Sequence, residues 1–535
     1  MTRGLLSIAI TSSLLLVGCN DDNDSFVSDV TNAPKNISNF TASQIDAELA
    51  KATAFGKDVT PNAICGVTVE KIIYQTKGSG GESTNATAAL MLPNGSNPIC
   101  KGDLPVLLHA HGTAVEKTYD FTQVGNTDNT AGVRATLMAA NFAAQGYIVV
   151  VPNYAGYDIS NLDYHPYLNA KQQSEEMVTA LDTARTIIKQ QHNAKNSRYL
   201  NVEDSGKLFL TGYSQGGHVV MATARLLQKQ NKPVTAIAPS SGPYALAAFG
   251  DAIFAGNVNL GSTKFAPLLA VSLQKVNNNI YSNPTEVFTP QYANTILPNA
   301  TSFEDLVEAG KIPANALFQK APTGIAAIDQ LKPSELPFAS VGFDDSEYLF
   351  QNSFRAAYLA DAQANPDGLL VPNGNAMTAA NPQSNIRKAL KDNDVRNYVP
   401  KMPTLICGGN QDPTVFFDLN TGSVSSILQK VSATNPAAKL NITVLDVDAT
   451  NSDKRPNKPT LTMIGNASMN PWNIQSVVSN VQGKFASTLQ QTVADAIKQG
   501  VNPQVAVLSN YHASLVSTAC TNATREFFEQ NFNQS

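Results

Sequence analysis

A serine between glycines is the residue of this sequence whose setting most directly indicates chemistry. Ser214 lies in the stretch LTGYSQGGHVV, which runs from Leu210 to Val220 and fits the pattern G-x-S-x-G. An apolar run typical of a buried strand precedes it, and residues at helical spacing follow it. A strand-to-helix turn of this kind lifts a serine hydroxyl clear of a sheet, and glycines permit the tight bend. We therefore predict that Ser214 is a nucleophile.

A serine nucleophile needs a base, and the sequence has only six histidines from which to choose it. In sites built on a strand, a turn and a helix, the order along the chain is serine, acid, histidine. Four histidines precede Ser214, and His218 lies in the helix that leads away from the turn. His512, in the stretch LSNYHASLV, therefore remains as the predicted base; the structural alternative is a histidine of a surface loop.

The acid should follow a core strand, because it must hold the imidazole from the side opposite the serine. Asp412 lies in the stretch LICGGNQDPTV, in a polar, glycine-rich loop directly after an apolar run. Asp418 is the rival, but it follows Val415 to Phe417, where we expect the next helix to begin. We predict Asp412 as the acid; the structural alternative is a solvated turn or helix-capping aspartate.

Two backbone N–H groups are needed to stabilise a tetrahedral oxyanion. Gln215, the residue after the serine, supplies one. The stretch HAHGT is expected to supply the other from Thr113, because Gly112 permits close approach of the backbone. His109 and His111 in this stretch have the spacing of a metal-binding pair, but no cluster of Asp, Glu or Cys lies nearby, so we predict no metal and no cofactor.

The N-terminus resembles a bacterial export signal. A charged start is followed by an apolar stretch that is short for a membrane span, and LLLVGC, which ends at Cys19, resembles the lipobox of bacterial lipoproteins. We predict a signal peptide over residues 1–19, lipidation of Cys19 and a tether and entry segment over residues 20–60. The protein would then be lipid-anchored in the bacterial cell envelope, at the outer membrane; the alternative is a plain secretory signal and a secreted protein.

The other four cysteines form an even set in a chain predicted to be exported, which favours two disulfides. Three connectivities are possible, and we favour Cys65 with Cys100 and Cys407 with Cys520; buried free thiols are the alternative. None of the four shows the spacing of a zinc site.

The second bridge would join the loops of the acid and of the histidine. Cys407 lies five positions before Asp412, and Cys520 lies eight positions after His512. The closure of so long a loop contributes about 4–5 kcal/mol in the chain-entropy account of disulfides. We therefore expect reduction to lower activity or thermal stability.

The elements that position these residues alternate between buried strands and helices. Apolar runs at residues 106–108, 147–151 and 208–210 are separated by segments with helical spacing, such as 171–191. This order predicts an α/β fold with a mostly parallel central sheet flanked by helices. The apolar fraction of 43% and charged fraction of 15% indicate a packed protein, and the net charge of −5 without a basic cluster excludes a nucleic-acid partner.

The alternation stops at residue 243 and resumes with MPTLICGG near residue 403. We therefore predict a first core segment over residues 61–242, a large, mostly helical lid or cap insertion over 243–400, and a second core segment over 401–535. A further irregular region is expected over 449–472, followed by a long helix up to residue 499.

Six stretches carry a resemblance to a known family: HAHGT, VVVPNYAGYD followed by HPYL, LDTAR, GYSQGGH, GGNQDPTV and YHASLV. The chain resembles the α/β-hydrolases, and more narrowly the secretory lipase family and its bacterial lipoprotein relatives, over about residues 66–242 and from 402 onward. Asn153 departs from the aspartate that family members often carry there.

The resemblance implies a serine hydrolase that cleaves small-molecule carboxylic esters, often lipids, through an acyl-enzyme and without a cofactor. A serine peptidase on the same fold and a non-catalytic surface lipoprotein are the alternatives. The sequence does not indicate an oligomeric state.

Overall fold

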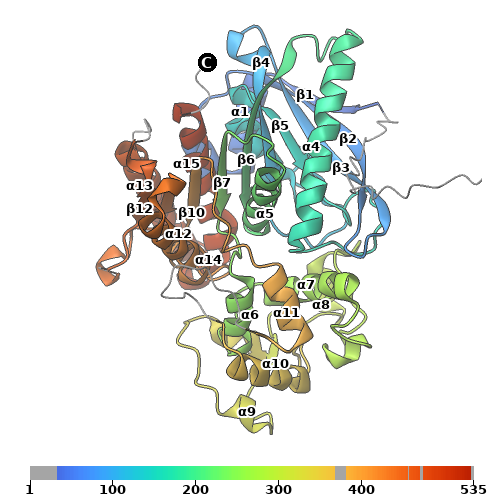
Figure 1. The fold of residues 1–535 in the computed structure, drawn as a ribbon, viewed down its shortest axis with the longest axis vertical. Helices are drawn as coiled ribbons and strands as arrows, with labels where there is room; N and C mark the ends of the chain where they lie inside the picture. The colour runs from blue at the N-terminus through green and yellow to red at the C-terminus, as the bar shows by residue number, and fades with distance from the viewer. Residues whose placement is uncertain (1–32, 368–380, 456, 470–473, 532–535) are drawn as a thin grey trace, which may run out of the picture.

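A ten-stranded sheet forms the centre of the molecule (Figure 1). The computed structural model describes residues 33–367, 381–455, 457–469 and 474–531; the predicted signal peptide and Cys19 lie outside them. The strand order is β1-β2-β3-β5-β4-β6-β7-β10-β11-β12. The strands are β1 (Lys35–Phe40), β2 (Gly66–Lys77), β3 (Ser83–Asn94), β4 (Gly102–Ala110), β5 (Ile148–Pro152), β6 (Val202–Tyr213), β7 (Ala236–Ser240), β10 (Thr404–Gly408), β11 (Asn441–Asp446) and β12 (Leu461–Gly465).

The six central strands, from β5 to β11, run parallel, whereas β1, β2, β3 and β12 pair antiparallel at the two edges. Every residue of β5, β7 and β10 is buried, as expected for strands that are covered on both faces. The predicted α/β class with a mostly parallel sheet is confirmed. β12 lies in the region expected to be irregular; four of its five residues are at least partly exposed, so it shows no apolar run.

Helices cover both faces of the sheet. α4 and α5 pack against each other on one face, while α1, α3 and α15 pack together on the opposite face. Among the described residues, no helix combines the length and apolar character needed to cross a membrane. The helices around the sheet are α1 (Ala42–Ala52), α2 (Ala54–Val59), α3 (Gly132–Asn141), α4 (Ala170–Asn193), α5 (Gln215–Lys229), α12 (Ser423–Thr434), α13 (Ile474–Lys498), α14 (Pro503–Asn510) and α15 (Ser517–Asn531).

Most of the segment assigned to the tether and entry region is folded. Residues 35–59 form β1, α1 and α2. α1 begins at a capping box, in which Thr41 and Gln44 satisfy each other's backbone N–H groups. The helix buries Ile45 and Leu49 completely in the main core. The part of this segment that the structure describes from β1 onward is therefore integrated into the main core.

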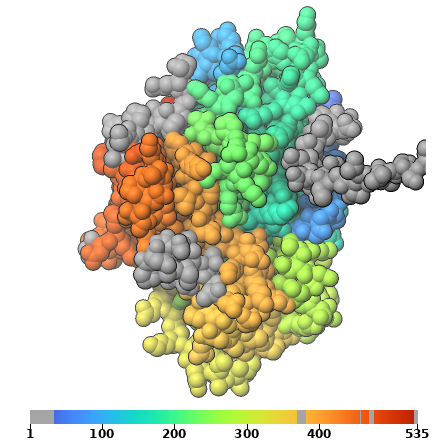
Figure 2. Space-filling model, in the orientation of Figure 1, coloured from blue at the N-terminus to red at the C-terminus, as the bar shows by residue number. Residues whose placement is uncertain are grey.

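The chain leaves the sheet after β7 and returns at β10, and the intervening residues 243–400 are named the cap. Figures 1 and 2 show it as the lower part of the molecule. It has an apolar core of its own, built around side chains such as Leu268, Phe318 and Tyr358. Its elements are α6 (Leu246–Phe254), α7 (Ser262–Asn277), α8 (Phe303–Glu308), α9 (Ala326–Asp329), α10 (Asn352–Ala364), α11 (Asn385–Asp392) and the short strands β8 (Phe318–Gln319) and β9 (Phe343–Asp344).

Candidate active site

Three side chains predicted from distant parts of the sequence meet at one edge of the sheet. The hydroxyl of Ser214 lies 2.9 Å from Nε2 of His512, and Nδ1 of the same ring lies 2.6 Å from Oδ2 of Asp412. Ser214 follows β6, Asp412 follows β10, and His512 lies in a π-helical turn between α14 and α15. The arrangement allows a proton to pass from the serine to the imidazole while the carboxylate fixes the ring.

The serine sits in a strained turn. Its backbone angles are φ 60° and ψ −125°, a conformation that residues with a side chain rarely adopt. The backbone N–H of Ser214 donates to the carbonyl of Ser240, which holds the turn against β7. Gly216 is required here, because a Cβ at that position would lie 1.9 Å from the carbonyl oxygen of Ala110. The turn therefore has the geometry of a nucleophile elbow.

Asp412 is fixed by its own loop. Its Oδ1 accepts hydrogen bonds from the backbone N–H groups of Thr414 and Val415, both at 2.9 Å, which leaves Oδ2 directed at His512. The carboxyl group is almost completely buried, with 1% of the side chain exposed. The rival Asp418 is half exposed and pairs with Arg455 instead. Of the two candidate acids, only Asp412 contacts the histidine.

A buried polar network supports the acid and the histidine from behind, and sequence reasoning missed it. The hydroxyl of Tyr511, the neighbour of His512, donates to Oδ2 of Asp448 at 2.5 Å and accepts from the backbone N–H of Gln411 at 3.1 Å. The amide of Gln411 also donates to Asp448, at 2.9 Å. The acid loop and the histidine turn thus share one carboxylate.

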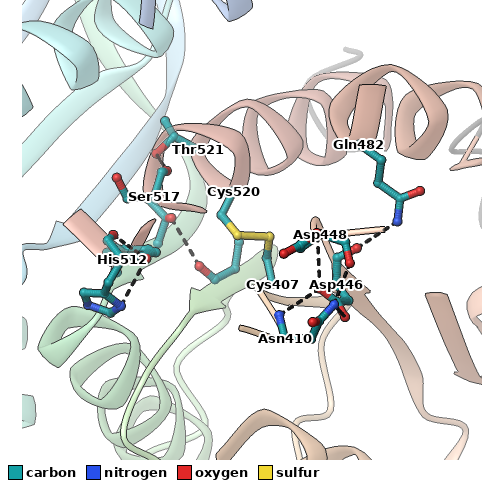
Figure 3. The surroundings of a disulfide bond; sticks show 12 residues. Cys407, Asn410, Asp446, Asp448, Gln482, His512, Ser517, Cys520 and Thr521 are labelled. Carbon is teal, nitrogen blue, oxygen red and sulfur yellow. Dashed lines mark hydrogen bonds between the residues drawn. A yellow bond between two sulfur atoms is a disulfide. The ribbon is translucent and has the colours of Figure 1, made fainter. Parts of the chain in front are cut away.

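A second carboxylate, Asp446, binds Asn410, which lies two positions before Asp412. Asn410 donates to Asp446 from both its backbone N–H and its side-chain amide, at 3.1 and 2.7 Å (Figure 3). Burial raises the pKa of Asp446 to about 7. The end of β11 therefore anchors the whole acid loop.

Both predicted disulfides are present with the favoured pairing, Cys65–Cys100 and Cys407–Cys520. The second joins β10 to the first turn of α15, between His512 on one side and the Asp446 network on the other (Figure 3). The strand that carries the acid and the helix that follows the histidine are therefore covalently linked.

The residues predicted to bind an oxyanion lie around the serine. A Cβ built on Gly112 would be 3.4 Å from Cβ of Ser214, so the HAHGT loop passes directly beside the nucleophile. Thr113 uses its hydroxyl to bond the hydroxyl of Tyr167 at 2.8 Å, which fixes the loop. Gln215 is the first residue of α5, where unpaired N–H groups and the helix dipole favour negative charge.

The side chain of Gln215 is buried and is held by a hydrogen bond to His165. Its amide donates to Nε2 of His165 at 2.7 Å, and Nδ1 of that ring donates to the carbonyl of Ala155 at 2.9 Å. Burial lowers the pKa of His165 to about 3, so the ring is neutral and can accept the bond. This histidine had no assigned role from the sequence.

His109 and His111, the pair weighed as metal ligands, are buried among aromatic rings. The ring of His111 stacks on Tyr154 with centroids 4.1 Å apart, and the ring of His109 lies 5.7 Å from that of Phe121. Within the described part of the chain, no group of three or more potential ligands surrounds them.

Two cavities meet at Ser214. The first, the apolar cavity, has a volume of about 110 Å³, starts at Ser214 and Gln215 and extends into the cap. The second, the polar cavity, has a volume of about 380 Å³ and contains Ser214 and His512. The apolar cavity is lined chiefly by Leu246, Phe249, Ile253, Phe254, Leu269 and Phe354. The polar cavity is lined, among others, by Glu116, Tyr119, Arg134, Tyr213 and Lys264.

Comparisons with known proteins agree with this architecture. The sequence profile of the dienelactone hydrolase family matches residues 127–242, which include the turn of Ser214. The rice cell wall degrading esterase LipA from Xanthomonas oryzae is 24% identical, with a TM-score of 0.58, over 79% of this chain and 92% of its own. A Legionella pneumophila protein proposed to be a hydrolase is 20% identical, with a TM-score of 0.52, over 73% of this chain and 86% of its own.

No curated protein sequence gives a significant match. The two structural relatives are similar in fold, and the family profile covers the part of the core that holds the serine turn. With the sheet order and the elbow at Ser214, these findings show that the chain has the α/β-hydrolase fold.

Proposed function

We propose that this protein is a serine hydrolase that cleaves carboxylic esters through an acyl-enzyme. The observation that supports this most directly is the hydrogen-bonded series Ser214, His512 and Asp412, at 2.9 and 2.6 Å. A hydroxyl, an imidazole and a buried carboxylate in this order are the groups that general-base activation of a serine requires.

The proposed reaction has two steps. His512 takes the proton of Ser214 at Nε2 while Oγ attacks the ester carbonyl, and Asp412 stabilises the resulting imidazolium. The backbone N–H groups of Gln215 and Thr113 bind the oxyanion. His512 then gives the proton to the departing alcohol, and a water molecule activated by the same ring releases the acid.

The apolar cavity favours an ester with a hydrocarbon acyl group. It opens at Ser214 and is enclosed by aliphatic and aromatic side chains of α6, α7 and α10, such as Leu246, Leu269 and Phe354. Each methylene group that moves from water into such surroundings contributes about 0.8 kcal/mol. The proposed substrates are therefore esters or lipids whose acyl chain enters the cap.

We further propose that the mature protein is anchored in the bacterial cell envelope through lipid on Cys19. The support is the stretch LLLVGC after a short apolar run. Metabolic labelling with a fatty acid should be lost in Cys19→Ser, and persistent labelling of that variant would contradict the anchor.

A fluorophosphonate probe tests the nucleophile. It should label Ser214, and Ser214→Ala should abolish both labelling and cleavage of a p-nitrophenyl ester. Ser262→Ala is the matched control, because Ser262 lines the apolar cavity and bonds to Asn259 rather than to a histidine. Labelling and ester cleavage that survive Ser214→Ala would refute the proposal. A parallel panel of aminoacyl amides distinguishes an esterase from a peptidase.

A further inference from the structure

The two cavities that meet at the serine contain different catalytic groups. Gln215, an oxyanion donor in the proposed mechanism, lines only the apolar cavity, whereas His512 lines only the polar cavity. In acyl transfer, the histidine must protonate the departing oxygen, so the alcohol part of the ester has to leave on the side of the imidazole. The acyl part then occupies the apolar cavity, and the alcohol part occupies the polar one.

The polar cavity contains a guanidinium group that no carboxylate balances. Arg134, on α3, donates to the carbonyl of Ala513 and to the hydroxyl of Ser517, and its guanidinium carbon lies 5.8 Å from the ring centre of Tyr213. No ion pair of Arg134 is formed within the described part of the chain. The two bonds occupy two of its five N–H donors, so further donors remain for a ligand.

Of the three buried arginines described in the cap, two are paired with carboxylates, whereas Arg355 donates to the carbonyl of Phe254 and lies over the ring of Phe318. Arg387 forms ion pairs with Asp251 and Asp361, and Arg396 forms them with Asp367 and Asp394. Arg134 is only partly buried and has no carboxylate partner among the residues that the structure describes, so its free N–H donors are accessible to an anionic ligand. Arg134 differs from these arginines in that it lines a cavity that contains the catalytic serine.

The other charged side chains that line the polar cavity are Glu116, Lys264 and Glu304. Lys264 lies 3.9 Å from Glu304, and both side chains are exposed. Glu116 is partly exposed and lies on the loop that follows Thr113. An anionic group in this cavity can meet Arg134 beside Tyr213, the residue before the nucleophile.

We propose that Arg134 binds a carboxylate on the alcohol part of the substrate, so that the preferred substrates are esters of an apolar acid with an acidic alcohol. The inference rests on the proposed ester hydrolysis and adds the class of the leaving group. Arg134 acts in it as a specificity-determining residue: two charge-assisted hydrogen bonds from a planar guanidinium match the geometry of a carboxylate.

A pair of aryl esters with the same acyl chain tests this assignment. The probes are 3-carboxyphenyl octanoate and its neutral counterpart 3-carbamoylphenyl octanoate, and the readout is the ratio of their kcat/KM values. The full-length protein should prefer the anionic ester by about tenfold or more, as expected for a charge-assisted pair. Arg134→Met should bring the ratio close to one, Arg134→Lys should retain part of it, and Glu116→Gln should raise it.

The ratio distinguishes recognition of the carboxylate by Arg134 from disruption of the turn that carries His512. Arg134 contacts that turn through the carbonyl of Ala513. Both esters form the same octanoyl-enzyme, so a purely structural effect lowers both kcat/KM values equally and leaves the ratio unchanged. A wild-type ratio near one, or a ratio that Arg134→Met does not change, would overturn the inference. If the wild-type protein cleaves neither ester and Ser214 resists the fluorophosphonate, the proposed function itself fails.

Discussion

Removal of the Cys407–Cys520 bridge should lower both the stability of the fold and the activity of the site, whereas removal of Cys65–Cys100 should lower stability alone. The bridge spans 113 positions of the chain, whereas Cys65–Cys100 spans 35. The loop-closure relation gives a contribution of about 5 kcal/mol for the first and about 4 kcal/mol for the second. The double variants Cys407→Ala/Cys520→Ala and Cys65→Ala/Cys100→Ala should therefore lose similar amounts of unfolding free energy.

Their activities should differ, because only the first bridge links the strand of the acid to the helix after the histidine. A displacement of about 1 Å between reacting groups can cost on the order of a hundredfold in rate. We expect kcat to fall about tenfold or more without the Cys407–Cys520 bridge and to stay within about twofold without Cys65–Cys100. Urea unfolding gives the stabilities, and kcat is measured at a temperature where both variants are folded. Equal losses of kcat in the two variants would refute the assigned role.

Three further predictions follow from the geometry of the site and of the core. Asp412→Asn should lower kcat about 10⁴-fold while the rival's variant, Asp418→Asn, stays active, as ester hydrolysis assays would show. Leu269→Trp should fill the apolar cavity and lower kcat/KM for octanoyl esters while acetyl esters are spared; an unchanged chain-length profile would exclude this cavity as the acyl site. Acid should destabilise the fold, because burial lowers the pKa of four histidines from 6.5 to about 3 or 4, so the unfolded chain binds more protons below pH 6.5. Each histidine adds up to about 1.4 kcal/mol per pH unit between pH 6.5 and its folded pKa. Two carboxyls with pKa values raised to about 7, Asp446 and Glu176, bind protons in the folded state and offset about half of this slope. Urea midpoints at pH 7, 6 and 5 should therefore still decrease, and a flat profile would contradict the neutral histidines. The four buried histidines with lowered pKa values are His109, His111, His165 and His218.

The sequence allowed the three central residues to be predicted because each has a local signature. Ser214 has glycines on both sides, and Asp412 follows a buried run. His512 remains after four histidines are excluded by chain order and His218 by its place in the helix after the turn. The contact between Tyr511 and Asp448 has no such signature, because it joins residues 63 positions apart in loops of unremarkable composition. Long-range pairing of polar side chains depends on the folded backbone, and no local pattern of residue types in the sequence reveals it.

In the fold and in the cavities, too, the features with a local signature in the sequence could be predicted and the others could not. The fully buried strand β10 is visible as an apolar run, whereas the edge strand β12 is half exposed and carries no periodic signal. Arg134 lies on α3, whose apolar residues have the helical spacing of a face that packs on the core. That pattern does not indicate that the charge of Arg134 faces a cavity. Its place in the cavity of the serine follows from the packing of α3 against α15 and from its hydrogen bond to the carbonyl of Ala513.

The cap begins and ends at neighbouring strands, since Ile237 of β7 pairs with Thr404 of β10, and Ser240 pairs with Cys407. Because these strands are parallel, the chain leaves the carboxyl end of β7 and re-enters the sheet at the amino end of β10. Before it re-enters, the backbone N–H groups of Val395 and Arg396 both donate to the carbonyl of Tyr244, at 3.0 and 3.1 Å, so the segment between Tyr244 and Val395 begins and ends at adjacent points. A module attached in this way can be exchanged or resized without stretching the scaffold that carries the serine, the acid and the histidine. Chimeras that graft a cap from another protein of this fold between β7 and β10 should therefore inherit the donor's acyl preference while keeping the host's reaction chemistry.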